Sequence, residues 1–254
     1  MIQRASVRSY KPDEPSREMV EAVVRAGLQA PFAAQLGSVL LRRGCETNPF
    51  GAPFLFTICA DIHRLELILD ARGWQRATSD AAMLLFAIQD ASYLAENMVI
   101  AAESLGLGSC YLGGAAFAAA EIAAEYGLPP RVYPFVQLAM GFPASPPTPR
   151  PRYPLSFTLH EGCYCEPGPE DVRKAMAAMD DGYLAQDYYR DYVIPLEGQR
   201  RETFTRATYS WTGHMGRKWG QWFRDPEDLL VPLRACGFDI GGPKEARDSE
   251  ALSA

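Results

Sequence analysis

The stretch DAAMLLFAIQDASYLAENMVIAAESLGLGSCYLGG, residues 80–114, contains the longest periodic segment of the chain. Between Asp80 and Leu107 its apolar residues recur at helical spacing with few polar breaks, which predicts a helix buried on most sides. The glycine-punctuated run over residues 106–114 is expected to form a strand or a loop. We infer the rest of the fold outward from this helix.

Upstream of it, one long helix, two strands and one short helix are predicted. Ser16 is a good N-cap for a helix that ends at Pro31. The runs SVLLRR (38–43) and PFLFTICAD (53–61) are short, apolar and rich in strand formers. The second is apolar on both faces, which predicts a central strand, and HRLELILDARG (63–73) is expected to be a short helix.

Downstream, the alanine-rich run 116–129 predicts a helix and YPFVQLAMGFP (133–143) a strand. Strands and helices therefore alternate from residue 16 to residue 142, which indicates an α/β or α+β sandwich around one sheet. Residues 143–154 form a proline-rich, extended connector. It precedes a polar helix at about 169–190, two further helical stretches and a tail after Gly241 that we expect to be disordered.

Composition restricts the class of protein. The chain has 254 residues and a net charge of −6, so its surface as a whole does not attract nucleic acid or an acidic membrane. The six cysteines show no zinc-type spacing and are interpreted as reduced thiols of a cytoplasmic protein. We find no secretion signal, and the longest apolar stretch is too short to cross a bilayer.

Two groups of arginines could bind an anion. RASVRSY (4–10) places Arg4, Ser6 and Arg8 on one side of an extended segment, where they could clamp a phosphate or form a solvated basic N-terminus. Arg150 and Arg152 lie in the stiff connector, as a second arm of such a clamp or as part of a plain surface linker. The residues alone leave these alternatives open.

Side-chain catalysis has little support in the sequence. The glycines of residues 106–114 match neither a Rossmann fingerprint nor a P-loop, although they would let a flat ligand approach the backbone. The sequence lacks a G-x-S-x-G elbow and a histidine–carboxylate cluster with metal spacing. Arg200 and Arg201 could bind a further phosphate. We therefore expect any chemistry to belong to a cofactor.

As a set, these motifs resemble the nitroreductase family of FMN-dependent NAD(P)H oxidoreductases. The motifs RASVRSY, RAGLQAP, AAESLGLGSCYLGG, LAMGFP and PRPRYPLSFTLHE occur in the family's order, and the resemblance covers about residues 3–238. With QRRETF downstream, the chain most resembles the branch of oxygen-insensitive NADPH nitroreductases and flavin reductase P. This implies an α+β fold: a three-layer α/β/α sandwich with a mainly antiparallel sheet, in an intertwined homodimer.

The resemblance also implies a division of the chain. Residues 1–160 would form the FMN-binding core. Residues 161–240 would form a helical extension that embraces the second subunit and covers NADPH and substrate, and 241–254 the disordered tail.

The site residues that the resemblance implies fall into three groups. The expected FMN-binding residues are Arg4, Ser6, Arg8, Ala33, Gln35, Leu112, Gly113, Gly114, Arg150 and Arg152. Arg200 and Arg201 would bind the 2′-phosphate of NADPH. No side chain would be catalytic as such: the backbone N–H of Gly114 would face flavin N5, and Arg8 would stabilise charge on the reduced flavin.

The implied activity is ping-pong hydride transfer from NADPH or NADH, through flavin N5, to a small acceptor such as a nitroaromatic, a quinone or a flavin. Two alternatives remain: a specialised FMN-dependent oxidase, dehydrogenase or enone reductase of a biosynthetic pathway, and an FMN-binding protein without turnover. The chain departs from the family in two loops, because PFAAQ (31–35) lacks a run of serines and GCETNPFGA (44–52) is short. A wider pocket for a bulky substrate is the hypothesis that follows.

Overall fold

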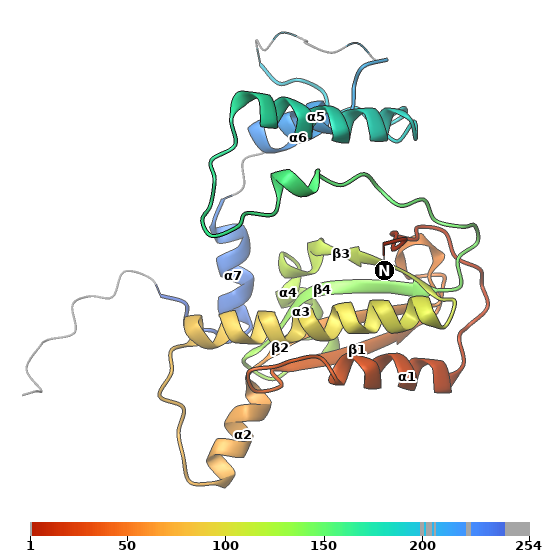
Figure 1. Ribbon diagram of the computed structural model, residues 1–254. Coiled ribbons are helices and arrows are strands. Elements are labelled where there is room, and N and C mark those ends of the chain that lie inside the picture. The colour runs from red at the N-terminus through yellow and green to blue at the C-terminus, as the bar shows by residue number, and fades with distance from the viewer. Residues whose placement is uncertain (1, 199–200, 202–204, 206, 222–224, 242–254) are drawn as a thin grey trace, which may run out of the picture. The chain divides into compact units, whose positions relative to one another are not determined.

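The computed structural model describes residues 2–198, 201, 205, 207–221 and 225–241. Their contacts define two compact units (Figure 1). The first consists of Met1–Thr148 together with Asp225–Ala254, and the second is Pro149–Arg224.

This division differs from the predicted boundary after residue 160. The chain leaves the first unit at Pro149, inside the proline-rich connector, and re-enters it at Asp225. The return is stabilised by burial, because Leu233 and Phe238 pack into the apolar core of the first unit. The predicted tail, 241–254, lies outside the described residues except for Gly241.

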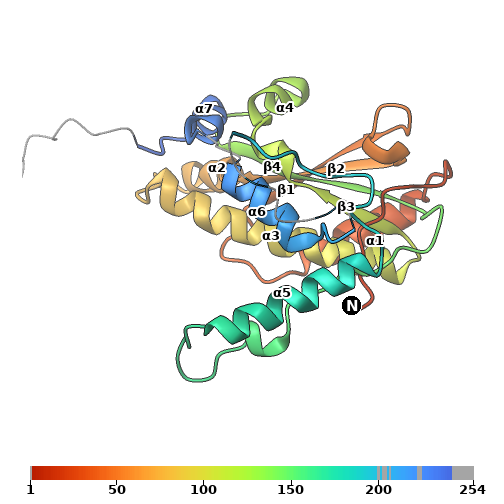
Figure 2. The ribbon, with the colours of Figure 1, turned by 90° about the horizontal axis from the view of Figure 1, so that it is seen from above.

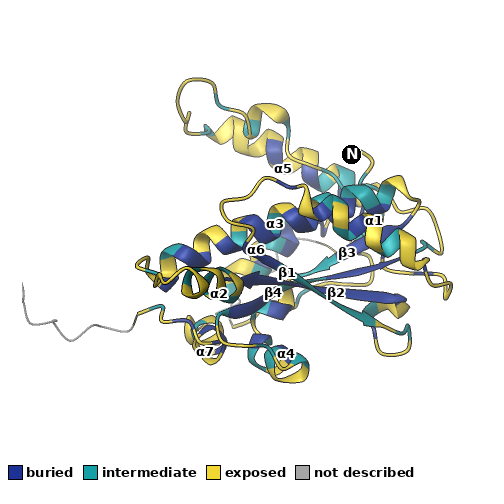
Figure 3. Cartoon of the chain, turned by 90° about the horizontal axis from the view of Figure 1, so that it is seen from below, coloured by how far each residue is buried: buried dark blue, intermediate teal, exposed yellow. Residues whose placement is uncertain are grey.

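Four antiparallel strands form the sheet of the first unit. They are β1 (Gly37–Arg43), β2 (Phe54–Asp61), β3 (Gly108–Leu112) and β4 (Val132–Gly141). Their order across the sheet is β1-β2-β4-β3, so β1 and β3 are the two edges. Every residue of β2 is buried, which confirms the predicted central strand (Figure 3).

Helices cover both faces of this sheet. The helices of the first unit are α1 (Arg17–Leu28), α2 (His63–Ala71), α3 (Asp80–Ser104), α4 (Ala119–Tyr126) and α7 (Glu227–Ala235), with the 3-10 turns η1 (Pro49–Gly51) and η2 (Gly113–Ala116). Helices α1 and α3 lie on one side and α4 and α7 on the other (Figure 2). Along β2, Phe56 faces the core shared with α1 and α3, while its neighbour Leu55 points to the other face. The result is the predicted three-layer sandwich.

Helix α3 packs against the sheet along one stripe. Its N-cap Ser79 accepts a hydrogen bond from the Ala82 N–H at 3.4 Å. In this chain the opposite side of α3 is open, because Leu85, Phe86 and Tyr93 are 58%, 43% and 47% exposed. The prediction that this helix is buried on most sides therefore holds in the single chain except along this exposed stripe.

The second unit contains η3 (Leu155–Phe157), α5 (Pro169–Leu184) and α6 (Trp211–Gln221). Helices α5 and α6 pack around a small aromatic core that includes Tyr183, Tyr189 and Tyr209. Asp180 of α5 accepts a hydrogen bond from the Thr212 N–H at 2.8 Å, which satisfies a free donor in the first turn of α6.

Candidate functional site

The N-terminal segment runs beside the edge strand β3. Ser6 forms an isolated parallel β-bridge with Ser109, and the Val7 N–H donates a hydrogen bond to the Ser109 carbonyl at 2.9 Å. Ala5 and Val7 are buried, whereas Arg8 is exposed, so the alternation expected of an extended segment is observed. A Cβ at Gly108 would collide with Val7, which explains why β3 carries glycine at this point.

Tyr10 fixes the far end of this segment. Its hydroxyl donates to the carbonyls of Val7 at 2.8 Å and Ala139 at 3.1 Å. Burial raises the pKa of the Tyr10 phenol, so it stays protonated and keeps donating at physiological pH. The backbone that carries the predicted arginines is thus tied to the sheet.

A cavity of about 520 Å³ opens where β3 ends. It is lined by Arg8, Pro49, Phe50, Cys110, Tyr111, Leu112, Gly113, Gly114, Ala115, Ala118, Ile122 and Gln137. Four of the predicted FMN-binding residues therefore meet in one place: Arg8, Leu112, Gly113 and Gly114. Around the two glycines, an added Cβ would meet nothing within 4 Å, so their backbone faces open space. They begin η2, whose first N–H groups have no partner within the turn.

The surroundings of Arg4 indicate whether an anionic cofactor fits the N-terminal segment. Its Nη1 is buried and has no hydrogen-bond partner among the described atoms. Leaving a buried donor without an acceptor costs about 1–3 kcal/mol, and more for a charged group. Nearby, burial raises the pKa of Tyr111, as does Glu96, and Arg4 opposes the shift. The unsatisfied donor of Arg4 is suited to bind the phosphate of FMN. The exposed Arg8, which lines the cavity, is suited to lie beside the flavin ring.

The loop that carries Ala33 and Gln35 is held by a residue that the sequence analysis did not select. The buried carboxylate of Asp90 accepts hydrogen bonds from the N–H groups of Ala33 at 2.6 Å and of Ala34 and Leu36, both at 3.0 Å. Arg64 donates to the Gln35 carbonyl at 3.0 Å. These contacts keep Gln35 in the left-handed region, at a φ of 54°.

This loop does not reach the cavity beside Arg8. It precedes β1, whereas Leu112, Gly113 and Gly114 follow or end β3 at the opposite edge of the sheet. Three strand spacings of about 4.8 Å separate the edges, roughly 14 Å in all. Gln35 instead lines a small cavity with Asp90 and Arg64. Within one chain, the two predicted groups of flavin contacts are apart.

In the second unit, Arg150 is held rather than free. Its Nη1 donates to Gln186 Oε1 at 2.5 Å, and its guanidinium lies 4.0 Å above the ring of Tyr188. Arg152 is exposed and donates to the carbonyls of Arg150 and Pro151. Arg201 is exposed, and Arg200 lies outside the described residues.

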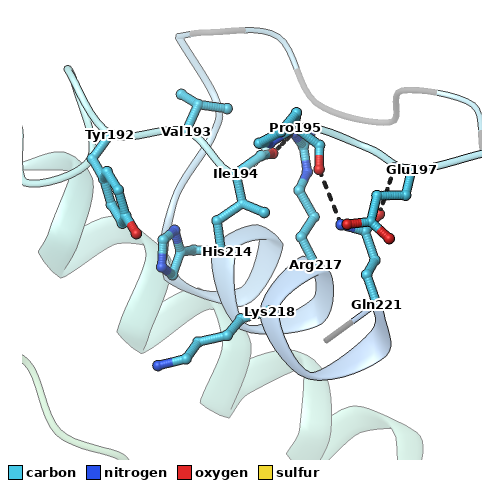
Figure 4. Close-up of a pocket in the computed structure, with 9 residues that line it drawn as sticks. All are labelled: Tyr192, Val193, Ile194, Pro195, Glu197, His214, Arg217, Lys218 and Gln221. Carbon is cyan, nitrogen blue, oxygen red and sulfur yellow. Dashed lines mark hydrogen bonds between the residues drawn. The ribbon is translucent and has the colours of Figure 1, made fainter. Parts of the chain in front are cut away.

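A second cavity, of about 690 Å³, lies in this unit (Figure 4). Its lining comes from residues 192–197 and from α6, including His214, Arg217 and Lys218. Arg217 Nη1 donates to the Ile194 carbonyl at 2.6 Å, which ties the segment 192–197 to the helix. The segment 192–197, which lines the cavity, therefore comes just before Arg200 and Arg201 in the sequence.

The imidazole of His214 lies in this cavity, against two tyrosines. The Tyr209 hydroxyl accepts from the Ile194 N–H at 3.1 Å and also forms a hydrogen bond with His214 Nδ1, 3.0 Å away, in which either atom can be the donor. The ring also stacks on Tyr189 at 4.4 Å. Burial lowers the pKa of His214, and the positive charges of Lys218 and Arg217 lower it further.

Comparison with known proteins decides the family. The model described as "Nitroreductase family" matches residues 40–142. FMN reductase (NADPH) of Bacillus subtilis (strain 168) is 33% identical over 221 residues, 81% of this chain and 86% of the relative. The chain belongs to the nitroreductase family. Oxygen-insensitive NADPH nitroreductase of Salmonella typhimurium (strain LT2) is 32% identical, with 84% of this chain and 86% of the relative covered.

The nitroreductase fold is confirmed by a solved structure, that of B. megaterium NfrA2. It superposes with a TM-score of 0.79 at 20% identity and covers 94% of this chain and 96% of its own. The family assignment from the sequence motifs is confirmed as well. The nitroreductase model spans β1 to β4 and includes Leu112, Gly113 and Gly114, while the predicted arginines lie outside it.

Among the described residues, the structure contains neither a metal-binding group nor a membrane-spanning helix. There, no three histidine, cysteine or acidic side chains are placed to bind a metal ion together. Within the same ranges, no helix has both the length and the apolar character needed to span a membrane.

The lowered pKa of His214 makes the stability of this nitroreductase depend on pH. Below the unfolded pKa of about 6.5, the unfolded chain binds the proton more tightly than the folded one, so the free energy of unfolding falls as pH falls. For one proton the slope stays below about 1.4 kcal/mol per pH unit. Urea unfolding at several pH values from about 7.5 to 5.5 gives the free energy of unfolding at each pH. We expect this free energy to depend less steeply on pH in His214→Gln than in wild type. Equal pH dependences of the free energy of unfolding for wild type and His214→Gln would contradict the assignment.

Proposed function

We propose that this chain is an FMN-dependent NAD(P)H oxidoreductase that passes hydride in ping-pong fashion to a small nitroaromatic, quinone or flavin acceptor. The observation that carries the proposal is the cavity at the end of β3, which is lined by Arg8 and by the open backbone of Gly113 and Gly114. The unsatisfied donor of Arg4 supports it. So do the names of the relatives, an FMN reductase (NADPH) and an NADPH nitroreductase.

FMN, when bound, supplies reversible acceptance and donation of hydride. The residues of the chain then have to bind and orient rather than react. Arg4 and Ser6 would hold the phosphate, with Arg150 and Arg152 reaching the phosphate and ribityl chain. Arg8 would place a fixed positive charge beside the reduced ring, and Gly113 and Gly114 would let the ring lie against backbone N–H groups. This division of labour explains why no side-chain nucleophile is needed.

A homodimer would complete the site. Ala33 and Gln35 are at the opposite sheet edge from the cavity, so they would contact the FMN held mainly by a second copy of the chain. The open side of α3, with Leu85, Phe86 and Tyr93, provides apolar surface of the kind that subunit interfaces bury. The residues 161–240 would embrace the second subunit and cover NADPH and substrate.

Coenzyme choice would depend on Arg200 and Arg201, which follow the cavity of Figure 4 in sequence. We expect Arg201→Ala to lower kcat/KM for NADPH by about tenfold, or about 1.5 kcal/mol. This value is the lower limit for a charge-assisted contact, because Arg201 is exposed. NADH lacks the 2′-phosphate, so its kcat/KM should not change. The NADPH to NADH ratio of kcat/KM, measured for wild type and variant, checks this. An unchanged ratio would refute the role of Arg201.

The test of the function is an anaerobic titration of the purified protein with NADPH, followed by steady-state kinetics. We expect the flavin absorbance to bleach with about one equivalent of NADPH and to return with a quinone or nitroaromatic. Initial rates at several fixed acceptor concentrations should give parallel double-reciprocal lines. Turnover of a substrate without NAD(P)H would indicate an oxidase or dehydrogenase, and flavin that NAD(P)H fails to bleach would indicate a binding protein.

A further inference from the structure

The loop between η3 and α5 carries two cysteines whose thiols have no role of their own in the proposed function. Cys163 and Cys165 are both exposed (the loop lies just before α5 in Figure 2). Of the other four cysteines, Cys45 is half-buried and Cys59, Cys110 and Cys236 are buried. The motif CYC therefore presents the two most accessible thiols of the chain to solvent.

The loop that carries these two cysteines is curled by local contacts. The Cys165 N–H donates to His160 Nδ1 at 3.3 Å, which curls the segment, and Gly162 has a left-handed φ of 78°. The Cys165 thiol points back along the chain, 3.8 Å from the Cys163 carbonyl oxygen. Cysteines two positions apart have Cα atoms at most about 7 Å apart, and a disulfide needs about 4.4–6.8 Å. The spacing of two positions is therefore compatible with a Cys163–Cys165 disulfide in a bent backbone.

The buried thiols are poor competitors for the same reagents. Burial raises the pKa of Cys59 to about 12 and that of Cys236 to about 11. Because the thiolate is the nucleophile, these two cysteines react slowly at neutral pH. Exposure therefore favours reaction of an oxidant at the CYC loop, and Cys59 and Cys236 compete little with it.

We propose that Cys163 and Cys165 form a reversible redox site that reacts with small neutral disulfides. The thiolate of one cysteine attacks a sulfur of the disulfide RSSR, forms a mixed disulfide and releases one RS⁻. The thiolate of the other cysteine then attacks the protein sulfur of that mixed disulfide, forms the Cys163–Cys165 bond and releases the second RS⁻. The leaving groups take up the two thiol protons, so two protein thiols are oxidised and RSSR is reduced to two RSH. A neutral reagent is specified because the carboxylates of Glu161 and Glu166 flank the loop.

The test uses the full-length protein, reduced, desalted and incubated with 2-hydroxyethyl disulfide, then quenched in acid and digested with trypsin. The peptide between Arg152 and Arg173 contains Cys163 and Cys165 and no other cysteine. We expect this peptide to lose two hydrogen masses and to carry no adduct. Cys163→Ser and Cys165→Ser should instead retain the hydroxyethylthio adduct, at least about tenfold more than wild type, because the resolving thiol is gone.

Cys45→Ser is the matched control, since it removes the remaining thiol that is not buried. It should leave the ring in the 153–173 peptide unchanged. The proposal is overturned if the wild-type peptide retains the hydroxyethylthio adduct to the same extent as the single variants retain it at their one remaining cysteine. Linkage of chains through these cysteines in place of the ring, seen on a non-reducing gel, would overturn it as well.

Discussion

Replacement of Arg4 and Arg8 together by alanine should weaken FMN binding by about 3–6 kcal/mol, roughly a hundredfold or more in Kd. Each arginine can make charge-assisted bonds worth about 1.5–3 kcal/mol. Arg4 has a buried donor without an acceptor, and Arg8 lines the cavity with Gly113 and Gly114. Fluorescence titration of flavin-free wild type and variant with FMN measures the two dissociation constants.

The matched control removes the same charge elsewhere on the first unit. Arg17 and Arg25 lie on α1 with side chains 83% and 79% exposed. Their double replacement by alanine should leave the FMN dissociation constant within about twofold of wild type, because exposed charges far from a ligand are screened. If both double variants bound FMN as wild type does, the arginines would have no part in the site.

The second large effect concerns Asp90. Asp90→Ala should lower the free energy of unfolding by about 3–5 kcal/mol, because it removes a buried carboxylate that accepts three backbone N–H bonds. The loss leaves the donors of Ala33, Ala34 and Leu36 without their acceptor. Urea unfolding gives the stability, and hydrogen exchange of those three amides reports on the loop itself.

Asp70→Ala is the control for this change, since Asp70 is exposed on α2. It should alter stability by less than about 0.5 kcal/mol. Asp90→Asn keeps one acceptor oxygen and should be intermediate, which provides a measurement if the alanine variant does not fold. Wild-type protection of the loop amides in Asp90→Asn, with no loss of stability, would show that the carboxylate does not hold the loop.

Two predictions that depended on local pattern were confirmed. Ser16 caps α1 by accepting from the Met19 N–H at 3.3 Å, and the two-sided apolar run 53–61 became the central strand β2. Both follow from contacts within a few residues or from the two-residue period of a strand. The family followed from the order of five motifs.

What the sequence could not show depends on partners far along the chain. Asp90 interrupts an apolar run, which was visible, but its acceptance of bonds from residues 33–36 depends on how α3 packs. The sequence placed Arg150 in a stiff connector, but the contacts that hold its guanidinium, Gln186 and Tyr188, are more than thirty residues away. The separation of Ala33 from Gly114 follows from strand order, which the alternation of elements does not specify.

The most direct test of the central claim, that the cavity beside Arg8, Gly113 and Gly114 holds FMN, is the visible spectrum of the freshly purified protein after gel filtration. The account predicts a yellow protein with the two absorption bands of oxidised flavin and about one FMN per chain. A colourless protein that remains colourless after incubation with excess FMN and a second gel filtration would contradict it.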